Sequence, residues 1–415
     1  MNSIQAKKMI PFSPPRVDQK IIDEVVDTLK SGWLTTGPKT KKFEKKLTSY
    51  CGNKSTLCLN SATAGLEIVL RWFGVTKGDE VILPSYTYSA TANVVIHCGA
   101  TPVFVDVQND FNIDPVKVRE AITANTKVIM PVDFGGWPCD YQKLNAIVRE
   151  STIQKKFIAA TKEQSDLGRI LILSDAAHSL GATYFGKKSG ALTDISVFSF
   201  HAVKNLTTGE GGAIAFNLDS PFDNDEVYKH LCVKTLHGQN KDALAKMQKG
   251  NWRYDIVEAG YKMNMTDILA SIGLVELERY DSETLPKRKS ICEAYNKAFA
   301  DKPWALLPEL KNDTQETSYH LYPLRIKGID EATRDKIMKN IFDKDISVNV
   351  HFIPVPMMSY YKSLGYSIEN YPQCYKNYSC EISLPIFFDL SVQQIDEIIS
   401  SVIQSVEEEL YIRTL

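Results

Sequence analysis

The sequence lacks paired cysteines. Its eight cysteines are scattered, and none stands in a Cys-x-x-Cys pair. Common zinc sites and dithiol redox motifs need such pairs, and a disulfide framework is unusual in a chain of 415 residues. We therefore expect no metal site, and we expect reduced thiols in a cytoplasmic protein.

Long apolar runs are also missing. No stretch approaches the ~20 apolar residues of a membrane-spanning helix. Residues 1–15 hold no apolar core of the length that a signal peptide needs. These absences again predict a cytoplasmic protein, with no membrane as a partner.

Neither sign of charge is in excess. The chain has 48 Lys and Arg against 50 Asp and Glu, for a formal net charge of −2, so it gives no electrostatic reason to expect nucleic acid as a partner. A nicotinamide-dependent oxidoreductase would need Gly-x-Gly-x-x-Gly after its first strand. The turn after Leu59 reads Asn-Ser-Ala-Thr-Ala-Gly instead, which disfavours that class.

Three short apolar runs organise the chain: Ile170–Leu173, Ile195–Phe200 and Ala213–Phe216. Their length and their glycine or polar boundaries predict buried strands rather than helices. Asp175 lies just past the first run, and Lys204 lies just past the second. Open α/β sheets usually bind their ligands at the carboxyl ends of such strands.

Lys204 and Asp175 are candidates for one chemistry. An amine near apolar walls loses hydration, its pKa falls, and it can form a Schiff base with an aldehyde cofactor. A buried carboxylate can keep the ring nitrogen of pyridoxal phosphate protonated. The alternatives are a solvated loop lysine and an aspartate that caps a helix beginning at Ala176.

Three motifs carry a family resemblance: SDAAHSLGA, SFHAVKN and TTGEGGA. They resemble the pyridoxal-phosphate-dependent sugar aminotransferases of the DegT/DnrJ/EryC1/StrS group, which have the fold type I of aspartate aminotransferase. The resemblance implies an α/β fold with a mostly parallel seven-stranded sheet in a large cofactor-binding domain, residues 1–277. A smaller α+β domain, residues 278–415, would follow. It also implies that Lys204 forms the Schiff base and that Asp175 pairs with the pyridinium nitrogen.

The resemblance assigns further residues to the site. Without the resemblance, these residues also have purely structural explanations, which are a capped helix, a plain connector, core packing and a structural histidine. For the cofactor, the implied residues are Ala62, Thr63 and Ser199 at the phosphate, Tyr88 stacked on the ring, His178 at the phenolic oxygen or over the ring, and Asn264, which would reach the phosphate of a neighbouring subunit. For the substrate, they are Trp33, Thr35 and His351. The role of Asn264 implies a homodimer with shared active sites.

The implied reaction moves an amino group from an amino acid, L-glutamate in most relatives, to a nucleotide-linked keto sugar. The sequence around Lys204 is His-Ala-Val-Lys-Asn, followed by Thr-Gly-Glu-Gly-Gly. It resembles the sequences of the branch of this family that acts at C4 of the sugar. We therefore expect a 4-keto-6-deoxy sugar substrate and a 4-amino sugar product for a surface polysaccharide such as lipopolysaccharide O-antigen. The alternatives are a 3-keto sugar aminotransferase and a non-catalytic regulator, and the intact Lys204 and Asp175 argue against the regulator.

Several elements outside the site are also predicted. Residues 151–169 are polar and charged and are expected to form a surface insertion. Helices are expected over residues 279–301, with a break at Pro286, and over Val392–Leu410. Strands are expected at His320–Ile326 and Ile346–His351.

Overall fold

The central sheet has seven strands in the order β1-β9-β8-β5-β4-β2-β3. The structure, a computed structural model, describes residues 9–241 and 253–414. Strand β9 runs antiparallel to both of its neighbours, and the other neighbouring pairs are parallel. The strands are β1 (Ser55–Leu59), β2 (Glu80–Pro84), β3 (Thr101–Val105), β4 (Thr126–Ile129), β5 (Leu171–Asp175), β8 (Ile195–Ser199) and β9 (Gly212–Phe216). The mostly parallel seven-stranded sheet is confirmed.

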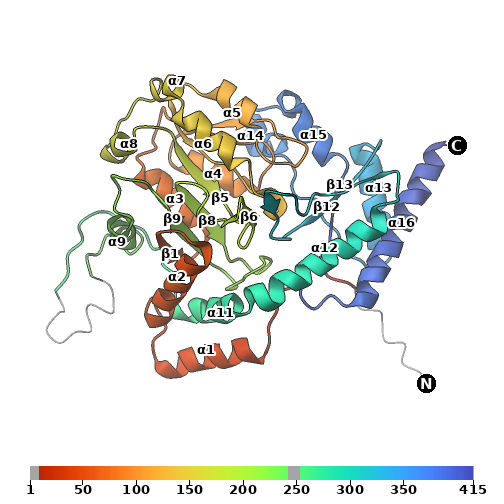
Figure 1. Cartoon of the computed structure of the whole chain (residues 1–415), viewed down its shortest axis with the longest axis horizontal. Coiled ribbons are helices and arrows are strands. Elements are labelled where there is room, and N and C mark those ends of the chain that lie inside the picture. Colours follow the sequence, from red (N-terminus) through yellow and green to blue (C-terminus); the bar gives the residue numbers. More distant parts are fainter. Residues whose placement is uncertain (1–8, 242–252, 415) are drawn as a thin grey trace.

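Helices cover both faces of this sheet (Figure 1). Alternate side chains of a strand point to opposite faces. Leu57 and Leu59 therefore pack with α3 and α4, while Cys58 packs with α2 and α11. The helices of this part are α1 (Gln19–Ser31), α2 (Pro38–Cys51), α3 (Ala62–Trp72), α4 (Ser89–His97), α5 (Pro115–Ala121), α6 (Tyr141–Arg149), α7 (Ser151–Gln154), α8 (Lys162–Leu167), α9 (Asn224–Lys234) and α11 (Asp267–Glu278).

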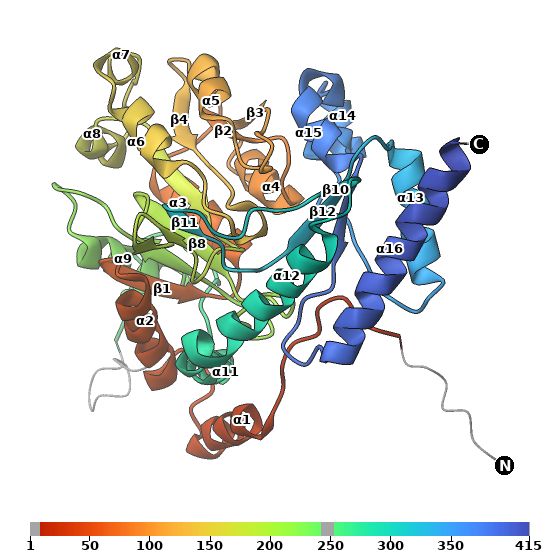
Figure 2. The ribbon, with the colours of Figure 1, turned by 45° about the vertical axis from the view of Figure 1, so that its right-hand side comes forward.

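A second core lies in the C-terminal part of the chain (Figure 2). There β10, β12 and β13 form an antiparallel sheet that packs with α12, α13 and α16. Ile10, from the N-terminal segment, is buried in this core and pairs with Ile346. The elements are α12 (Leu285–Phe299), β10 (Ala305–Leu306), β12 (Tyr322–Ile326), α13 (Glu331–Phe342), α14 (Ser359–Ser363), α15 (Pro372–Tyr378), β13 (Glu381–Leu384) and α16 (Val392–Thr414). A small sheet of β6 (Thr183–Tyr184), β7 (Lys187–Lys188) and β11 (Gln315–Glu316) joins the two parts. The boundary between residues 277 and 278 stays a prediction.

The predicted strand Ile346–His351 is wrong. Only isolated bridges form there, from Ile346 to Ile10 and from Asn349 to Ser383. Next to the bridge of Asn349 with Ser383, the N–H of His351 donates to the side-chain Oε2 of Glu381 at 3.2 Å and not to a backbone carbonyl of β13, so the ladder does not continue. The strand beside β12 is β13 instead, which the sequence pattern did not reveal.

The other C-terminal predictions hold better. Helix α12 begins at Leu285 with Pro286 in its first turn, after an irregular turn over Tyr280–Thr284, so the predicted break is confirmed. Residues 151–169 form α7 and α8 and are not wholly at the surface. Gln164 is buried, and its Nε2 donates to the carbonyl of Phe73 at 2.8 Å. None of the helices that the structure describes is long and apolar enough to cross a membrane.

A buried ion pair links the start of β5 to that of β8. The Arg169 guanidinium donates from Nη1 and Nη2 to the two carboxylate oxygens of Asp194 at 2.8 and 2.7 Å. The N–H of Ile172 also donates to Asp194, at 2.9 Å. Both charged side chains are nearly inaccessible, with 6% and 4% of their surface exposed. The pair therefore fixes the register of two strands that end at Asp175 and Ser199.

Removing one partner of this pair leaves a buried, uncompensated charge. We expect Asp194→Ala to lower the free energy of unfolding by ~3–5 kcal/mol, measured by urea denaturation. Lys117→Ala, which breaks the exposed pair with Glu120, is the matched control and should leave the unfolding midpoint unchanged. A loss below ~1 kcal/mol for Asp194→Ala would show that the buried pair contributes no more than a surface pair.

Candidate active site

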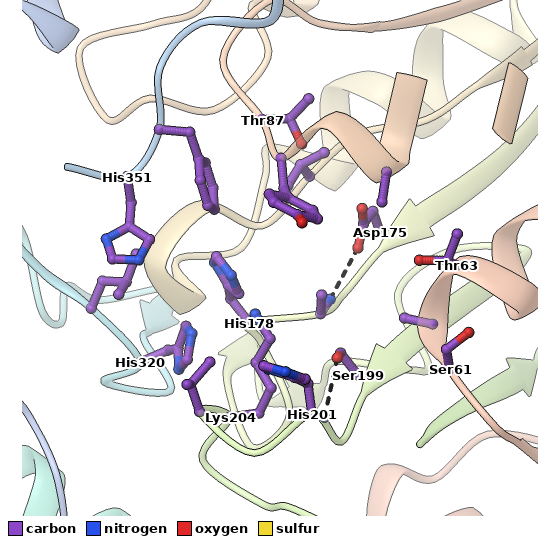
Figure 3. A pocket seen from close by; sticks show the side chains of 18 of the residues that line it. Ser61, Thr63, Thr87, Asp175, His178, Ser199, His201, Lys204, His320 and His351 are labelled. Carbon is purple, nitrogen blue, oxygen red and sulfur yellow. Dashed lines mark hydrogen bonds between the residues drawn. The ribbon is translucent and has the colours of Figure 1, made fainter. Parts of the chain in front are cut away.

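A cavity of about 350 Å³ opens at the carboxyl ends of β1, β5 and β8 (Figure 3). Large-domain residues line most of it, and His320, Leu321, His351 and Phe352 close it from the C-terminal part. The cavity brings together eight of the predicted residues: Ala62, Thr63, Tyr88, Asp175, His178, Ser199, Lys204 and His351.

Lys204 lies in the turn that follows β8, where its N–H donates to the carbonyl of His201 at 2.9 Å. Its side chain extends into the cavity beside His178 (Figure 3). Burial lowers the pKa of Lys204 to about 8, although the negative charge of Asp175 opposes this shift. The solvated-loop alternative is therefore disfavoured, because the amine is poorly hydrated.

Asp175 ends β5 on another wall of the cavity. One carboxylate oxygen accepts from the Thr91 hydroxyl at 2.8 Å, and the other accepts from the N–H of Ala177 at 3.3 Å. Thr91 also bonds Thr87 at 2.8 Å. Burial raises the pKa of Asp175, while these two hydrogen bonds and the charge of Lys204 favour its ionised form. No helix follows Asp175, so the helix-cap alternative is wrong.

The first turn of α3 forms a separate wall. Ser61 caps the helix by accepting from the N–H of Ala64 at 3.1 Å. The N–H groups of Ala62 and Thr63 lie in the first turn, where a helix offers no internal acceptors. A Cβ at Gly212 would lie 2.5 Å from the Ala62 nitrogen, so the absence of a side chain lets β9 pass this close. With Ser199 nearby, this wall is a ready site for an anion (Figure 3).

His178 and His320 both line the cavity and pack against each other, with ring centroids 4.3 Å apart and ring planes tilted by 43°. The Nδ1 of His178 accepts from the N–H of Gly135 at 3.3 Å. Burial lowers the pKa of His178 well below its ordinary value, so the ring is neutral and its hydrogen lies on Nε2. His178 can therefore donate a hydrogen bond to an oxygen in the cavity.

Trp33, Thr35 and Asn264 do not line the cavity. They meet around Thr36 instead: Trp33 Nε1 donates to the Thr36 carbonyl at 3.2 Å, and Asn264 Nδ2 donates to the Thr36 hydroxyl at 2.7 Å. The N–H of Asp267 donates to the Thr35 carbonyl at 3.1 Å. In the described part of a single chain, Trp33, Thr35 and Asn264 thus form a cluster that is separate from the cavity.

A helix cap lies next to this cluster. Thr266 caps α11 by accepting from the N–H of Leu269 at 3.4 Å. Asp267 has another role, because its carboxylate accepts from the N–H groups of Gly37 and Thr40, each at 2.8 Å, at the start of α2. This carboxylate therefore anchors the loop that carries Trp33 and Thr35.

Sequence reasoning missed several residues of the cavity. Thr91 holds Asp175 from a helix about eighty positions away, and His320 precedes β12. Phe352 packs on His178, with ring centroids 5.8 Å apart. The Ser-Tyr-Thr-Tyr-Ser-Ala-Thr run places Thr87 and Thr91 one helical turn apart, which was the available signal for a shared partner.

These residues fit the pyridoxal phosphate that the family resemblance implies. The α3 turn suits its phosphate, the buried carboxylate of Asp175 suits a protonated ring nitrogen, and the amine of Lys204 suits its aldehyde. Tyr88, with 61% of its surface exposed, lies at the edge of the cavity against Phe352, where it can cover a flat ring.

Comparison with known proteins identifies relatives over nearly the whole chain. The sequence profile of the DegT/DnrJ/EryC1/StrS aminotransferase family matches residues 15–403. The spore coat polysaccharide biosynthesis protein SpsC of Bacillus subtilis is 37% identical over 401 residues, which are 95% of this chain and 96% of SpsC.

Solved structures agree. The putative sugar aminotransferase Spr1654 from Streptococcus pneumoniae, in its PMP form, superposes with a TM-score of 0.93 at 47% identity, covering 96% of this chain and 100% of Spr1654. Its PLP form gives 0.92 at 45% identity, covering 97% and 99%. Helicobacter pylori PseC, an aminotransferase involved in the biosynthesis of pseudoaminic acid, gives 0.83 at 28% identity, covering 97% and 100%. The chain therefore belongs to the DegT/DnrJ/EryC1/StrS aminotransferase family and is a pyridoxal-phosphate-dependent sugar aminotransferase.

Proposed function

We propose that this enzyme transfers the amino group of L-glutamate to C4 of a nucleotide-linked 4-keto-6-deoxy sugar. The observation that carries the transaminase chemistry is the amine of Lys204, held in the same cavity as Asp175. The choice of C4 rests on the stretch from His201 to Glu210, whose sequence resembles the branch of the family that acts at C4. Both of these end residues line the cavity, and their side chains approach within 3.7 Å.

When bound, pyridoxal phosphate supplies an aldehyde that carries the amino group and a ring that accepts an electron pair from the substrate carbon. The residues described above divide the task of holding it. The first turn of α3 and Ser199 would bind its phosphate, His178 would donate to its phenolic oxygen, and Asp175 would keep its ring nitrogen protonated.

Lys204 has two roles in this proposal. Its amine would hold the cofactor through the aldehyde and would be released when the amine of the donor takes its place. The freed Nζ then takes the proton from the α-carbon of glutamate, and in the second half of the reaction it returns a proton to C4 of the sugar. Capture of the cofactor and removal of the α-proton need an uncharged amine, which burial favours because it lowers the pKa of Lys204 to about 8. The return of a proton needs the ammonium form, which the amine reaches by taking a proton.

The capture of cofactor should report this pKa directly. We expect the initial rate at which cofactor-free protein binds pyridoxal phosphate covalently, followed by visible absorbance, to rise with pH through a midpoint near 8 rather than 10.5. Below that midpoint the lysine is an ammonium ion and cannot attack. Lys204→Ala should show no covalent capture at any pH. A rate that keeps rising toward pH 10.5 would contradict the lowered pKa.

The substrates can be tested in two half-reactions. L-glutamate should convert the cofactor absorbance of the purified enzyme. A panel of nucleotide-linked keto sugars should then reverse this change with 4-keto sugars and leave it intact with 3-keto sugars. Lys204→Ala should lower turnover by ~10²-fold or more, the usual contribution of a general acid–base group. Amination confined to 3-keto sugars would overturn the C4 assignment, and no response to any amino acid would favour the regulator.

We also propose that the enzyme works as a homodimer in which Asn264 reaches the cofactor phosphate of the neighbouring subunit. Two observations support this. Asn264, Trp33 and Thr35 lie together but away from the cavity of their own chain. Beside them, α1 and the following loop expose a set of large apolar side chains: Ile22, Val26, Leu29 and Leu34.

Mixed dimers test this arrangement. Asn264→Ala should weaken cofactor binding by about ten- to a hundredfold, the cost of one hydrogen bond to a charged group, and Lys204→Ala should abolish turnover. At limiting cofactor, a refolded mixture of the two variants should be more active than either variant alone, because one site of each mixed dimer then has both native residues. Activity equal to the average of the two variants would contradict shared sites.

We further place the enzyme in the cytoplasm, in the synthesis of a surface polysaccharide. All eight cysteines lie in the part of the chain that the structure describes, none of them forms a disulfide there, and seven of them are buried. This pattern fits a reducing compartment.

A further inference from the structure

Three side chains form a hydrogen-bonded relay that ends in the active-site cavity. Glu381 and Ser383 lie on β13, and His351 lies in the segment that faces it. The Ser383 hydroxyl bonds Oε1 of Glu381 at 2.5 Å and Nδ1 of His351 at 3.0 Å. His351 lines the cavity and stacks on Phe12, with ring centroids 5.3 Å apart (Figure 3).

The far end of this relay is a buried carboxyl group. Glu381 and Ser383 both have 0% of their surface exposed, and Glu381 forms no ion pair among residues 9–241 and 253–414. Burial raises the pKa of Glu381 to about 8, against the opposing effects of Ser383, the His351 N–H, Arg334 and Arg325. Glu381 therefore changes its protonation state near neutral pH, and the reaction proposed above does not use it.

The position of the added proton is determined by geometry. Oε2 of Glu381 accepts from the backbone N–H of His351 at 3.2 Å, so it is occupied as an acceptor. The proton must then reside on Oε1, which faces the Ser383 hydroxyl. Since Ser383 has only one hydrogen, protonation of Glu381 reverses the direction of both hydrogen bonds in the relay.

His351 stays neutral while this happens. Burial, reinforced by the charge of Lys204, lowers the pKa of His351 to about 3. A neutral imidazole carries one hydrogen on one of two nitrogens. With Glu381 ionised, Ser383 donates to Glu381 and accepts from Nδ1–H, so Nε2 is an acceptor. With Glu381 protonated, Ser383 donates to Nδ1, so the hydrogen moves to Nε2, which becomes a donor.

We propose that Glu381 and Ser383 are positioning residues that decide whether His351 donates or accepts a hydrogen bond on the substrate side of the cavity. The proposal rests on the proposed function in one respect, the sugar as ligand of His351. A keto oxygen accepts hydrogen bonds and leaves as water only after gaining protons, so it suits the donor form. The ammonium group that replaces it donates hydrogen bonds, so it suits the acceptor form.

Other charged and titratable groups face the relay and affect the protonation of Glu381 and His351. Around Glu381 they are Arg325 on β12, Arg334 on α13 and Tyr86 after β2. Around His351 they are Lys204, His178 and His320. The two histidines are neutral because burial lowers their pKa values well below the ordinary value, so Lys204 is the titrating neighbour on the cavity side. Lys204 would be bound to the cofactor in the enzyme loaded with pyridoxal phosphate, so in that form Glu381 is the group that controls the relay.

Imidazole nitrogen NMR of the cofactor-loaded enzyme tests the relay without any sugar. With ¹⁵N-labelled histidine, the His351 signals, assigned by their loss in His351→Gln, should exchange the Nε2–H pattern for the Nδ1–H pattern as the pH rises through about 8. In Glu381→Gln the amide can donate to Ser383 at every pH, so the Nε2–H pattern should persist. In Ser383→Ala the step near pH 8 should disappear. A wild-type pattern that does not change with pH, or a step that survives in either variant, overturns the proposal.

A kinetic comparison then connects the relay to the sugar. In the half-reaction of the aminated enzyme with the keto sugar, free Lys204 titrates near the same pH in both proteins, so the comparison between them reports the relay. The ratio of the wild-type rate to the Glu381→Gln rate should fall as the pH rises through about 8. The glutamate half-reaction is the internal control and should keep the same pH profile in both proteins. Equal changes in both half-reactions would overturn the assignment of the relay to the sugar. If no keto sugar reacts at all, the NMR measurement still decides the relay and the proposed function alone fails.

Discussion

Burial acts in opposite directions on the two charged groups at the centre of this enzyme. It favours the neutral amine of Lys204 and the protonated carboxyl of Asp175, because water that would solvate either charge is largely excluded. Two hydrogen bonds, from Thr91 and Ala177, keep Asp175 able to carry its charge. The site therefore holds a reactive amine and a stable carboxylate in one cavity, which neither group could achieve at an exposed position.

The sheet brings these two groups together. Strands β5 and β8 are parallel neighbours, so Asp175 and the turn with Lys204 emerge at the same edge. The buried pair of Arg169 and Asp194 fixes the opposite ends of the same two strands. The C-terminal part then adds His320, just before β12, and His351, in the segment that faces β13, and completes the walls.

The sequence predicted what depends on local pattern. The apolar runs gave the strands beside Asp175 and Lys204, and the motifs gave eight residues that do line the cavity. The strand expected at Ile346–His351 was wrong because the N–H of His351 bonds the side chain of Glu381 and not the backbone of β13. The contact of Thr91 with Asp175 was not predictable, because its two partners meet only when α4 packs beside β5. Trp33, Thr35 and Asn264 carry no local signal that would separate a position in their own cavity from one near another subunit.

The N-terminal segment crosses from one core to the other. Ile10 is buried in the C-terminal core, Phe12 stacks on His351, and Asp18, a few residues later, caps α1 and pairs with Arg279 at the end of α11. The segment between Ile10 and Asp18 therefore connects the C-terminal core to the start of α1. A division of the protein at residue 277 would also strip Ile10 from the core that it fills. The N-terminal segment therefore joins the two cores, and the chain does not divide cleanly into two separate parts.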